Sequence, residues 1–231
     1  MHYPIDKDLR ILQLNKLPLN ANIYPLFNLF MSVIFSCRSD NEVNVTSLRI
    51  PGYKGASLKT YVIEPKEVDD PLPCLVYFHG GAFMLKASGS HYKIAKEYAK
   101  RLHCKVVYVD YRLAPKHPFP IPVEDCYATY KWALQNADIL GIDPGRIIIG
   151  GDSAGGNLAT AVTLMARDRH LLLPAALLLI YPATDRRMIT KSMQEYTDTP
   201  VWNARLSKMM WDAYLPKEPA KHVKLRSQNL R

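Results

Sequence analysis

The stretch Arg-Ile-Ile-Ile-Gly-Gly-Asp-Ser-Ala-Gly-Gly-Asn at 146–157 decides the fold of this chain. Its β-branched run predicts a buried strand, and the apolar residues after the serine recur at helical spacing and predict a helix over 153–168. Between them, Gly-Asp-Ser-Ala-Gly at 151–155 matches G-x-S-x-G, a sharp turn that exposes a serine. We therefore predict that Ser153 is a nucleophile, presented above a sheet beside the positive end of a helix. The alternative is a glycine-rich turn whose serine only caps the helix.

Strands and helices alternate on both sides of this turn. Apolar or β-branched runs predict strands and amphipathic runs predict helices, in the order strand 74–78, helix 91–103, strand 105–109, helix 122–137 and, after the serine, strand 175–181. Such alternation is typical of a parallel sheet with helices on both faces. Upstream, β-rich runs at 43–50 and 58–63 flank a Pro-Gly turn and predict an antiparallel pair, which would make the sheet mixed. Residues 1–42 are expected to be mostly helical, with breaks at Pro18 and Pro25.

A second motif, His79-Gly80-Gly81-Ala82-Phe83, follows directly after the first buried strand. Attack of a serine on an ester carbonyl creates an oxyanion, which backbone N–H groups must stabilise. Glycines let the backbone approach closely and adopt conformations that other residues resist, although a plain glycine turn would show the same letters. We favour an oxyanion hole, because such a fold builds it in the loop after this strand.

A third stretch, from Asp110 to Pro120, has prolines at 115, 118 and 120 that stiffen the connection between a strand and a helix. We expect its role to be architectural rather than chemical.

Together the three stretches resemble the hormone-sensitive-lipase-like branch of the α/β-hydrolases, which includes bacterial acetyl esterases. The hallmarks of that family are H-G-G-G, Y-R-L-A-P-E and G-D-S-A-G-G. This sequence has HGGA at 79–82, YRLAPK at 111–116 and GDSAGG at 151–156, in the same order. The resemblance runs from about residue 40 to about residue 215.

This resemblance implies an α/β-hydrolase fold, with a mostly parallel sheet, flanking helices and a helical cap over the acyl pocket. The expected segments are an N-terminal helical cap segment (1–42), a hydrolase core (43–185), cap helices (186–216) and a basic tail (217–231). The implied oxyanion-hole donors are Gly81, Ala82 and Ala154, and the supporting positions are His79, Gly80, Gly151, Asp152 and Gly155. No metal or cofactor is expected. Two letters depart from the family pattern: Ala82 replaces a glycine and adds a methyl group to a crowded loop, and Lys116 replaces a glutamate.

A serine nucleophile also needs a base and an acid that orients the base. In the family both come later in the chain, the histidine often within H-G-F, and neither pattern follows Pro216. Asp185 is placed to serve as an acid, but we find no convincing base among His79, His91, His103, His170 and His222. We therefore expect little or no turnover, and hypothesise a truncated version of a longer esterase in which the last strands are missing.

The composition of the chain excludes several other classes of protein. Of 231 residues, 48% are hydrophobic and 22% are charged, which is typical of globular rather than disordered proteins. The net charge of +9 prompts a search for a nucleic-acid site, but five basic residues and one acidic residue fall in the last sixteen positions, and no basic stripe with aromatics is present. We expect no nucleic-acid partner.

The cysteines and the early apolar stretch indicate where the protein resides. The four cysteines are widely spaced and form no C-x-x-C pair, which favours a reducing compartment such as the cytoplasm. The stretch 23–35 is shorter than the ~20 residues of a membrane span, and it lacks the layout of a secretory signal. We expect an amphipathic helix packed on the body, with a membrane-surface anchor as the alternative.

These observations favour a hydrolase of short acyl esters that works through an acyl-enzyme, with a small-molecule ester as its partner. The alternative is a catalytically inactive binding protein that keeps the pocket but has lost its base. Missing last strands would also expose a sheet edge, which invites self-association.

Overall fold

The computed structural model describes residues 5–14, 18–67 and 71–215, so the expected basic tail 217–231 lies outside the described residues. Its centre is a six-stranded sheet with the order β1-β2-β4-β3-β5-β6. Neighbours pair antiparallel in β1·β2 and β2·β4 and parallel elsewhere, which confirms the predicted mixed sheet. The strands are β1 (Val43–Pro51), β2 (Ser57–Pro65), β3 (Leu72–Phe78), β4 (Lys105–Val109), β5 (Ile142–Asp152) and β6 (Ala176–Ile180).

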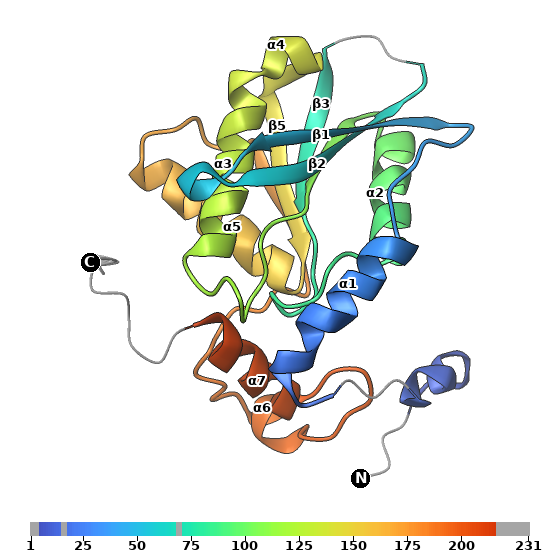
Figure 1. The fold of residues 1–231 in the computed structure, drawn as a ribbon, viewed down its shortest axis with the longest axis vertical. Coiled ribbons are helices and arrows are strands. Elements are labelled where there is room, and N and C mark those ends of the chain that lie inside the picture. The colour runs from blue at the N-terminus through green and yellow to red at the C-terminus, as the bar shows by residue number, and fades with distance from the viewer. Residues whose placement is uncertain (1–4, 15–17, 68–70, 216–231) are drawn as a thin grey trace.

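Helices cover both faces of the sheet (Figure 1). On one face α2 packs against β2 and β4, and on the other α3 and α5 pack against each other and against β3. The main helices are α1 (Tyr24–Ile34), α2 (Gly89–Leu102), α3 (Ile121–Gln135), α5 (Ala154–Asp168) and α7 (Ala204–Tyr214). The shorter ones are η1 (Lys7–Leu14), η2 (Ala21–Ile23), η3 (Tyr53–Gly55), α4 (Ala137–Leu140) and α6 (Lys191–Glu195).

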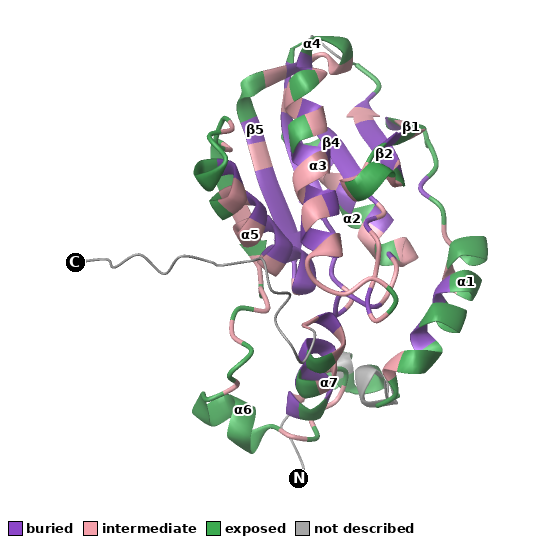
Figure 2. Ribbon diagram, turned by 60° about the vertical axis from the view of Figure 1, so that its left-hand side comes forward, coloured by how far each residue is buried: buried purple, intermediate pink, exposed green. Residues whose placement is uncertain are grey.

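The side chains of β3 show how the sheet separates two cores. Cys74, Val76 and Phe78 enter the core beneath α3 and α5, whereas Leu75 and Tyr77 enter the core beneath α2. This alternation follows from the period of two in a strand. Because both faces are covered, β3 and β4 are almost entirely buried (Figure 2).

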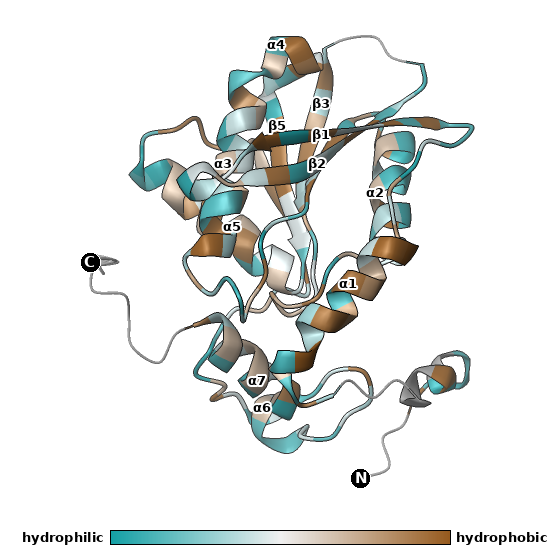
Figure 3. Cartoon of the chain, viewed as in Figure 1, coloured by the Kyte–Doolittle hydropathy of each residue, from teal (hydrophilic) through white to brown (hydrophobic). Residues whose placement is uncertain are grey.

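The N-terminal segment is less helical than expected. Between residues 35 and 42 the structure has no helix, and the expected break at Pro25 is wrong. Pro25 instead lies in the first turn of α1, where the N–H that proline lacks would have no partner anyway. α1 buries Tyr24 and Asn28. The large apolar side chains on its outward face are Leu26, Phe27, Leu29, Phe30, Val33 and Ile34, which give this helix its brown colour in Figure 3.

The strand β6 forms one edge of the sheet. Leu177 and Leu179 of this strand are 39% and 40% exposed, because among the described residues no strand pairs with the outer side of β6. The part of the chain that the structure covers has no helix with the length and hydropathy that a membrane crossing requires.

Candidate active site

The turn between β5 and α5 holds Ser153 in a strained backbone conformation. Its φ of 51° and ψ of −116° lie in a sparsely populated region that costs a residue with a side chain about 1–3 kcal/mol. Two hydrogen bonds fix the turn to the end of β6 and to the segment that follows it. The N–H of Ser153 donates to the Ile180 carbonyl (2.9 Å), and the N–H of Ala183 donates to the Ser153 carbonyl (3.0 Å). The half-buried serine is therefore held in place by its neighbours.

The glycines on both sides of the serine let this turn lie against the end of β3. A Cβ atom at Gly155 would lie 1.9 Å from the Phe78 carbonyl oxygen, and one at Gly151 would lie 2.5 Å from the same atom. Both distances are far below van der Waals contact. The pattern G-x-S-x-G thus has a steric reason here, since backbone meets backbone at both glycines.

The carboxylate of Asp152 joins the serine turn to the loop after β3. One oxygen accepts the N–H of Gly80 and the hydroxyl of Tyr77, both at 2.9 Å. The other lies 3.5 Å from Nε2 of His91 in α2. Burial raises the pKa of the Asp152 carboxyl, but the interactions with His91, Gly80 and Tyr77 outweigh burial and hold this pKa below its usual range. The sequence does not reveal that Tyr77 and His91 contact Asp152, because only the folded sheet brings them together.

The loop after β3 presents unpaired N–H groups. Gly81, Ala82 and Phe83 have consecutive positive φ values of 117°, 57° and 57°. Ala82 is buried (3% exposed), so its methyl group does stand in a crowded place. Within the described part of the chain, no hydrogen bond takes up the N–H of Gly81 or Ala82, nor that of Ala154 at the start of α5. These groups remain available to an incoming oxygen.

The imidazole of His79 is part of the packed interior. Its Nδ1 lies 2.6 Å from the Gly80 carbonyl oxygen, to which it donates, and its ring stacks on Tyr111 with centroids 4.5 Å apart. The hydroxyl of Tyr111 donates to the His79 carbonyl (2.7 Å). Burial lowers the pKa of His79 to about 4. The side chain is therefore neutral near pH 7, and it shapes the loop.

A cavity of about 470 Å³ opens in front of Ser153. Its walls come from the segment after β6 and from α7, and are mostly apolar. They include Met188, Ile189, Met193, Trp202, Met210 and Trp211. The helix α7 is anchored to the core, because the ring of Tyr214 stacks on Phe83 with centroids 3.8 Å apart. A volume of this order is typical of a small-molecule site.

The structure places Asp185 beside the same cavity. Both oxygens of its carboxylate accept hydrogen bonds from the guanidinium of Arg187, at 2.8 to 3.0 Å. These bonds also hold the pKa of Asp185 below its usual value. Within the described residues Asp185 thus orients an arginine and no histidine.

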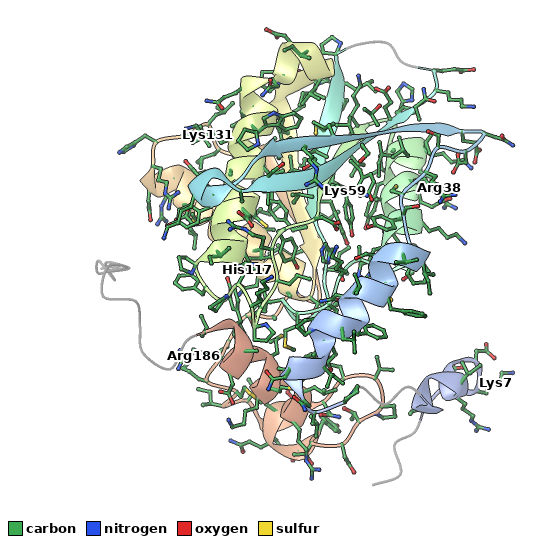
Figure 4. All side chains as sticks on the ribbon, viewed as in Figure 1. Lys7, Arg38, Lys59, His117, Lys131 and Arg186 are labelled. Atoms are coloured by element: carbon green, nitrogen blue, oxygen red, sulfur yellow. The ribbon has the colours of Figure 1, made fainter. Side chains whose placement is uncertain are left out.

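No histidine in the described ranges forms a hydrogen bond with Ser153. Their positions are His79 in the loop after β3, His91 and His103 within and at the end of α2, His117 in the connection into α3 (Figure 4), and His170 just after α5. His222 lies outside the described residues. Within the described residues, the serine that the sequence predicts as nucleophile therefore has no histidine bonded to it.

The segment 110–120 is fixed to neighbouring elements by side-chain hydrogen bonds, as an architectural role requires. Asp125 of α3 is fully buried, and its two oxygens accept hydrogen bonds from Nε and Nη2 of Arg112, both at 2.8 Å. Asp125 also accepts the N–H of Tyr53 (3.1 Å). This bidentate pair joins three segments that lie far apart in the sequence.

Over the residues that the structure describes, no group of three or more His, Cys, Asp or Glu side chains is arranged to hold a metal ion.

Comparison with known proteins relates this geometry to one family. Residues 75–229 match the family described as alpha/beta hydrolase fold. Carboxylesterase NlhH of Mycobacterium tuberculosis is 39% identical over 168 residues, which are 72% of this chain and 51% of that protein. Human hormone-sensitive lipase is 38% identical over 120 residues, which are 52% of this chain and 11% of the lipase. The chain therefore spans about half the length of the mycobacterial carboxylesterase and a smaller share of the human lipase.

Solved structures of similar proteins have the same fold. A bacterial heroin esterase superposes with a TM-score of 0.77 at 36% identity, covering 85% of this chain and 62% of the esterase. An esterase from Pyrobaculum calidifontis gives a TM-score of 0.79 at 33% identity, covering 93% of this chain and 71% of the esterase. In each case the solved chain is longer than the part that aligns.

Proposed function

Since the chain belongs to the α/β hydrolases, we propose that it is a serine carboxylic-ester hydrolase of the lipase-like type that acts on short acyl esters. The observation that carries this proposal is the strained serine turn, which borders a cavity and is joined through Asp152 to the loop that contains the unpaired N–H groups of Gly81 and Ala82. The names of the relatives, carboxylesterase and hormone-sensitive lipase, support the reaction class.

In the proposed reaction the Oγ of Ser153 attacks the ester carbonyl and forms a tetrahedral intermediate. The N–H groups of Gly81, Ala82 and Ala154 donate hydrogen bonds to the negative oxygen of this intermediate. Collapse expels the alcohol and leaves an acyl-enzyme, which water then hydrolyses to the acid. No metal or cofactor takes part. Since no described histidine can take the serine proton and return it to the leaving alcohol, both proton transfers would fall to solvent water, and we expect turnover to be weak.

We propose that the segments 1–42 and 186–216 form a cap over the acyl pocket of the core 43–185. Support comes from the cavity walls, because Met188, Trp202 and Trp211 of the second segment line the cavity together with Ser153. The apolar walls and moderate volume suit a small acyl group. Hydrolysis of p-nitrophenyl acetate, butyrate and decanoate by the same preparation tests this preference, and faster turnover of the decanoate would contradict it.

Covalent labelling tests the nucleophile directly. A fluorophosphonate probe should add slowly but specifically to Ser153, since an oxyanion hole alone retains part of the rate enhancement when the base is missing. Ser153→Ala should abolish labelling. Ser207→Ala is the matched control, because Ser207 lines the same cavity and donates no catalytic hydroxyl in this scheme; it should label like the wild type. Mass spectrometry of the adduct decides, and a probe that still adds to Ser153→Ala rejects the assignment.

The second candidate function is a catalytically inactive binding protein. It is favoured by the lack of any histidine bonded to Ser153 in the described part of the chain. Such a protein would bind small apolar esters without labelling at Ser153. Fluorescence of the cavity tryptophans during ester titration would reveal binding in that case.

We also infer a reducing compartment, and propose the cytoplasm. The four cysteines are buried free thiols in the structure, and burial raises the pKa of Cys74 to about 12 and that of Cys37 to about 11. Thiol titration of denatured protein that was purified without reductant should find four thiols, and a lower count would contradict the inference.

A further inference from the structure

The turn after β3 has a backbone that requires support from outside. Ala82 and Phe83 both have a φ of 57°, so two residues with side chains stand in the left-handed region, which is unfavourable for L-amino acids. Within the turn, the N–H groups of Met84 and Leu85 donate to the Gly81 carbonyl (2.9 and 2.7 Å). A conformation of this kind persists when the surrounding structure holds it on every side.

The body of the protein holds the first half of this turn. Before it, the N–H of Gly80 donates to Asp152 (2.9 Å). In its middle, the Phe83 carbonyl accepts the N–H of Ala114 (2.9 Å), and the ring of Phe83 stacks on Tyr214. The main-chain hydrogen bonds from the body stop at Phe83. Beyond it, the Met84 side chain is buried in the core and Nζ of Lys86 lies 3.9 Å from Oδ2 of Asp110, but the main chain of residues 84–86 has a different partner.

Asn28 of α1 is this partner. Its side-chain nitrogen donates to the Met84 carbonyl (2.6 Å), and its side-chain oxygen accepts the N–H of Lys86 (2.9 Å). One side-chain amide thus forms hydrogen bonds with the main chain on both sides of Leu85. Asn28 is only 8% exposed, so water cannot readily replace these two bonds.

The remainder of α1 offers no substitute for Asn28. The helix sequence YPLFNLFMSVI contains one carboxamide and no charged residue. The hydroxyl of Ser32 is engaged within the helix, where it donates to the Asn28 carbonyl (2.7 Å). The apolar residues of the outward face point to solvent, and most of α1 is accordingly green in Figure 2.

We propose that Asn28 is a positioning residue for the oxyanion hole. By fixing residues 84–86, it keeps the N–H groups of Gly81 and Ala82 directed at the site where the oxyanion forms. Asn28 itself does not touch the ester and acts through the loop. The catalytic meaning of this inference rests on the proposed function, and preorganised donors contribute most when they cannot turn away.

Three variants separate this role from simple helix packing. Asn28→Ala removes both hydrogen bonds. Asn28→Leu also removes both hydrogen bonds but keeps the branched shape of the side chain, and it serves if the alanine variant does not fold. Tyr24→Phe is the matched control, because Tyr24 is buried on the same helix but its hydroxyl donates to the Pro18 carbonyl (2.8 Å) and not to the loop.

The first readout is hydrogen exchange of the Met84 and Leu85 amides, which needs no catalytic activity. Their bonds to Gly81 lie inside the turn, so they report its opening rather than the lost contact itself. Asn28→Ala should accelerate their exchange about tenfold, the size expected for one lost buried hydrogen bond. Asn28→Leu should accelerate exchange to a similar extent, and Tyr24→Phe should leave it unchanged. Unchanged exchange in both Asn28 variants overturns the proposal, as does an equal acceleration in Tyr24→Phe.

The second readout is the rate of phosphonylation at Ser153. Asn28→Ala should lower the limiting rate constant about tenfold and leave the half-saturating probe concentration unchanged, since the oxyanion forms only during reaction. An unchanged limiting rate constant, together with a faster-exchanging turn, would also overturn the positioning role. If the probe does not react with the wild type at all, the proposed function fails, while the exchange data still decide whether Asn28 holds the turn.

Discussion

The steric fit at Gly155 leads to a prediction that opposes helix propensity. Gly155 lies in the first turn of α5 with a negative φ, so alanine would gain about 1 kcal/mol of helix stability there on propensity alone. Its Cβ, however, would lie 1.9 Å from the Phe78 carbonyl oxygen and 2.6 Å from the carbonyl carbon of the same residue. Contact at van der Waals distance would require the backbone of α5 or β3 to move by more than 1 Å.

Overpacking of a dense core costs about 1–3 kcal/mol. Because the added methyl group would meet backbone, which cannot rotate away, we expect the cost of Gly155→Ala to lie at the upper end of this range. After the propensity gain, the variant should lose about 2 kcal/mol of unfolding free energy. With a urea dependence of about 2 kcal/mol per molar, the unfolding midpoint should fall by about 1 M.

Urea unfolding followed by circular dichroism measures this shift. Gly156→Ala is the matched control, because it adds the same methyl group to the same helix turn but meets the Pro182 Cβ at 2.9 Å as its nearest atom. Its midpoint should fall by less than half as much. A Gly155→Ala variant as stable as the wild type would show that the serine turn does not lie against β3 as described.

The remaining predictions concern pH and assembly. Burial lowers the pKa of His79 to about 4, so as the pH falls the unfolded chain takes up this proton before the folded chain does. The free energy of unfolding should therefore decline between about pH 6.5 and about pH 4, by up to about 3 kcal/mol. Urea midpoints measured across this pH range should show a flatter decline for His79→Gln. We expect the edge of β6 that no described strand covers to pair with a second copy of the chain, so sedimentation should reveal concentration-dependent dimers. Leu177→Lys and Leu179→Lys together should yield monomers, and a wild type that stays monomeric at every concentration would contradict this expectation.

The sequence predicts the sheet and the serine turn because both depend on local patterns. Runs such as the one in β3 alternate between two cores, and the letters around Ser153 prescribe a strand, a bend and a helix. The predicted helix break at Pro25 is wrong for a local reason, because proline disrupts the interior of a helix but fits its first turn.

The supports of the candidate site could not be predicted in the same way. Tyr77 and His91 reach Asp152 only after β3, β5 and α2 have packed together, and Asn28 reaches Met84 across 56 positions of the chain. A faint signal existed for Asn28, as a lone carboxamide within an apolar helix. Its partners are main-chain atoms, however, and these leave no trace in the side-chain pattern.

The cavity in front of Ser153 joins a tightly packed serine turn to walls that can adapt. On either side of Ser153, backbone packs on backbone at Gly151 and Gly155, where even a methyl group does not fit. The walls include the unbranched thioether chains of Met188, Met193 and Met210, which can rearrange around guests of different shape. Substitutions at the methionines can therefore change selectivity while the serine turn stays intact. Variant libraries aimed at new acyl groups should leave Gly151 and Gly155 unchanged.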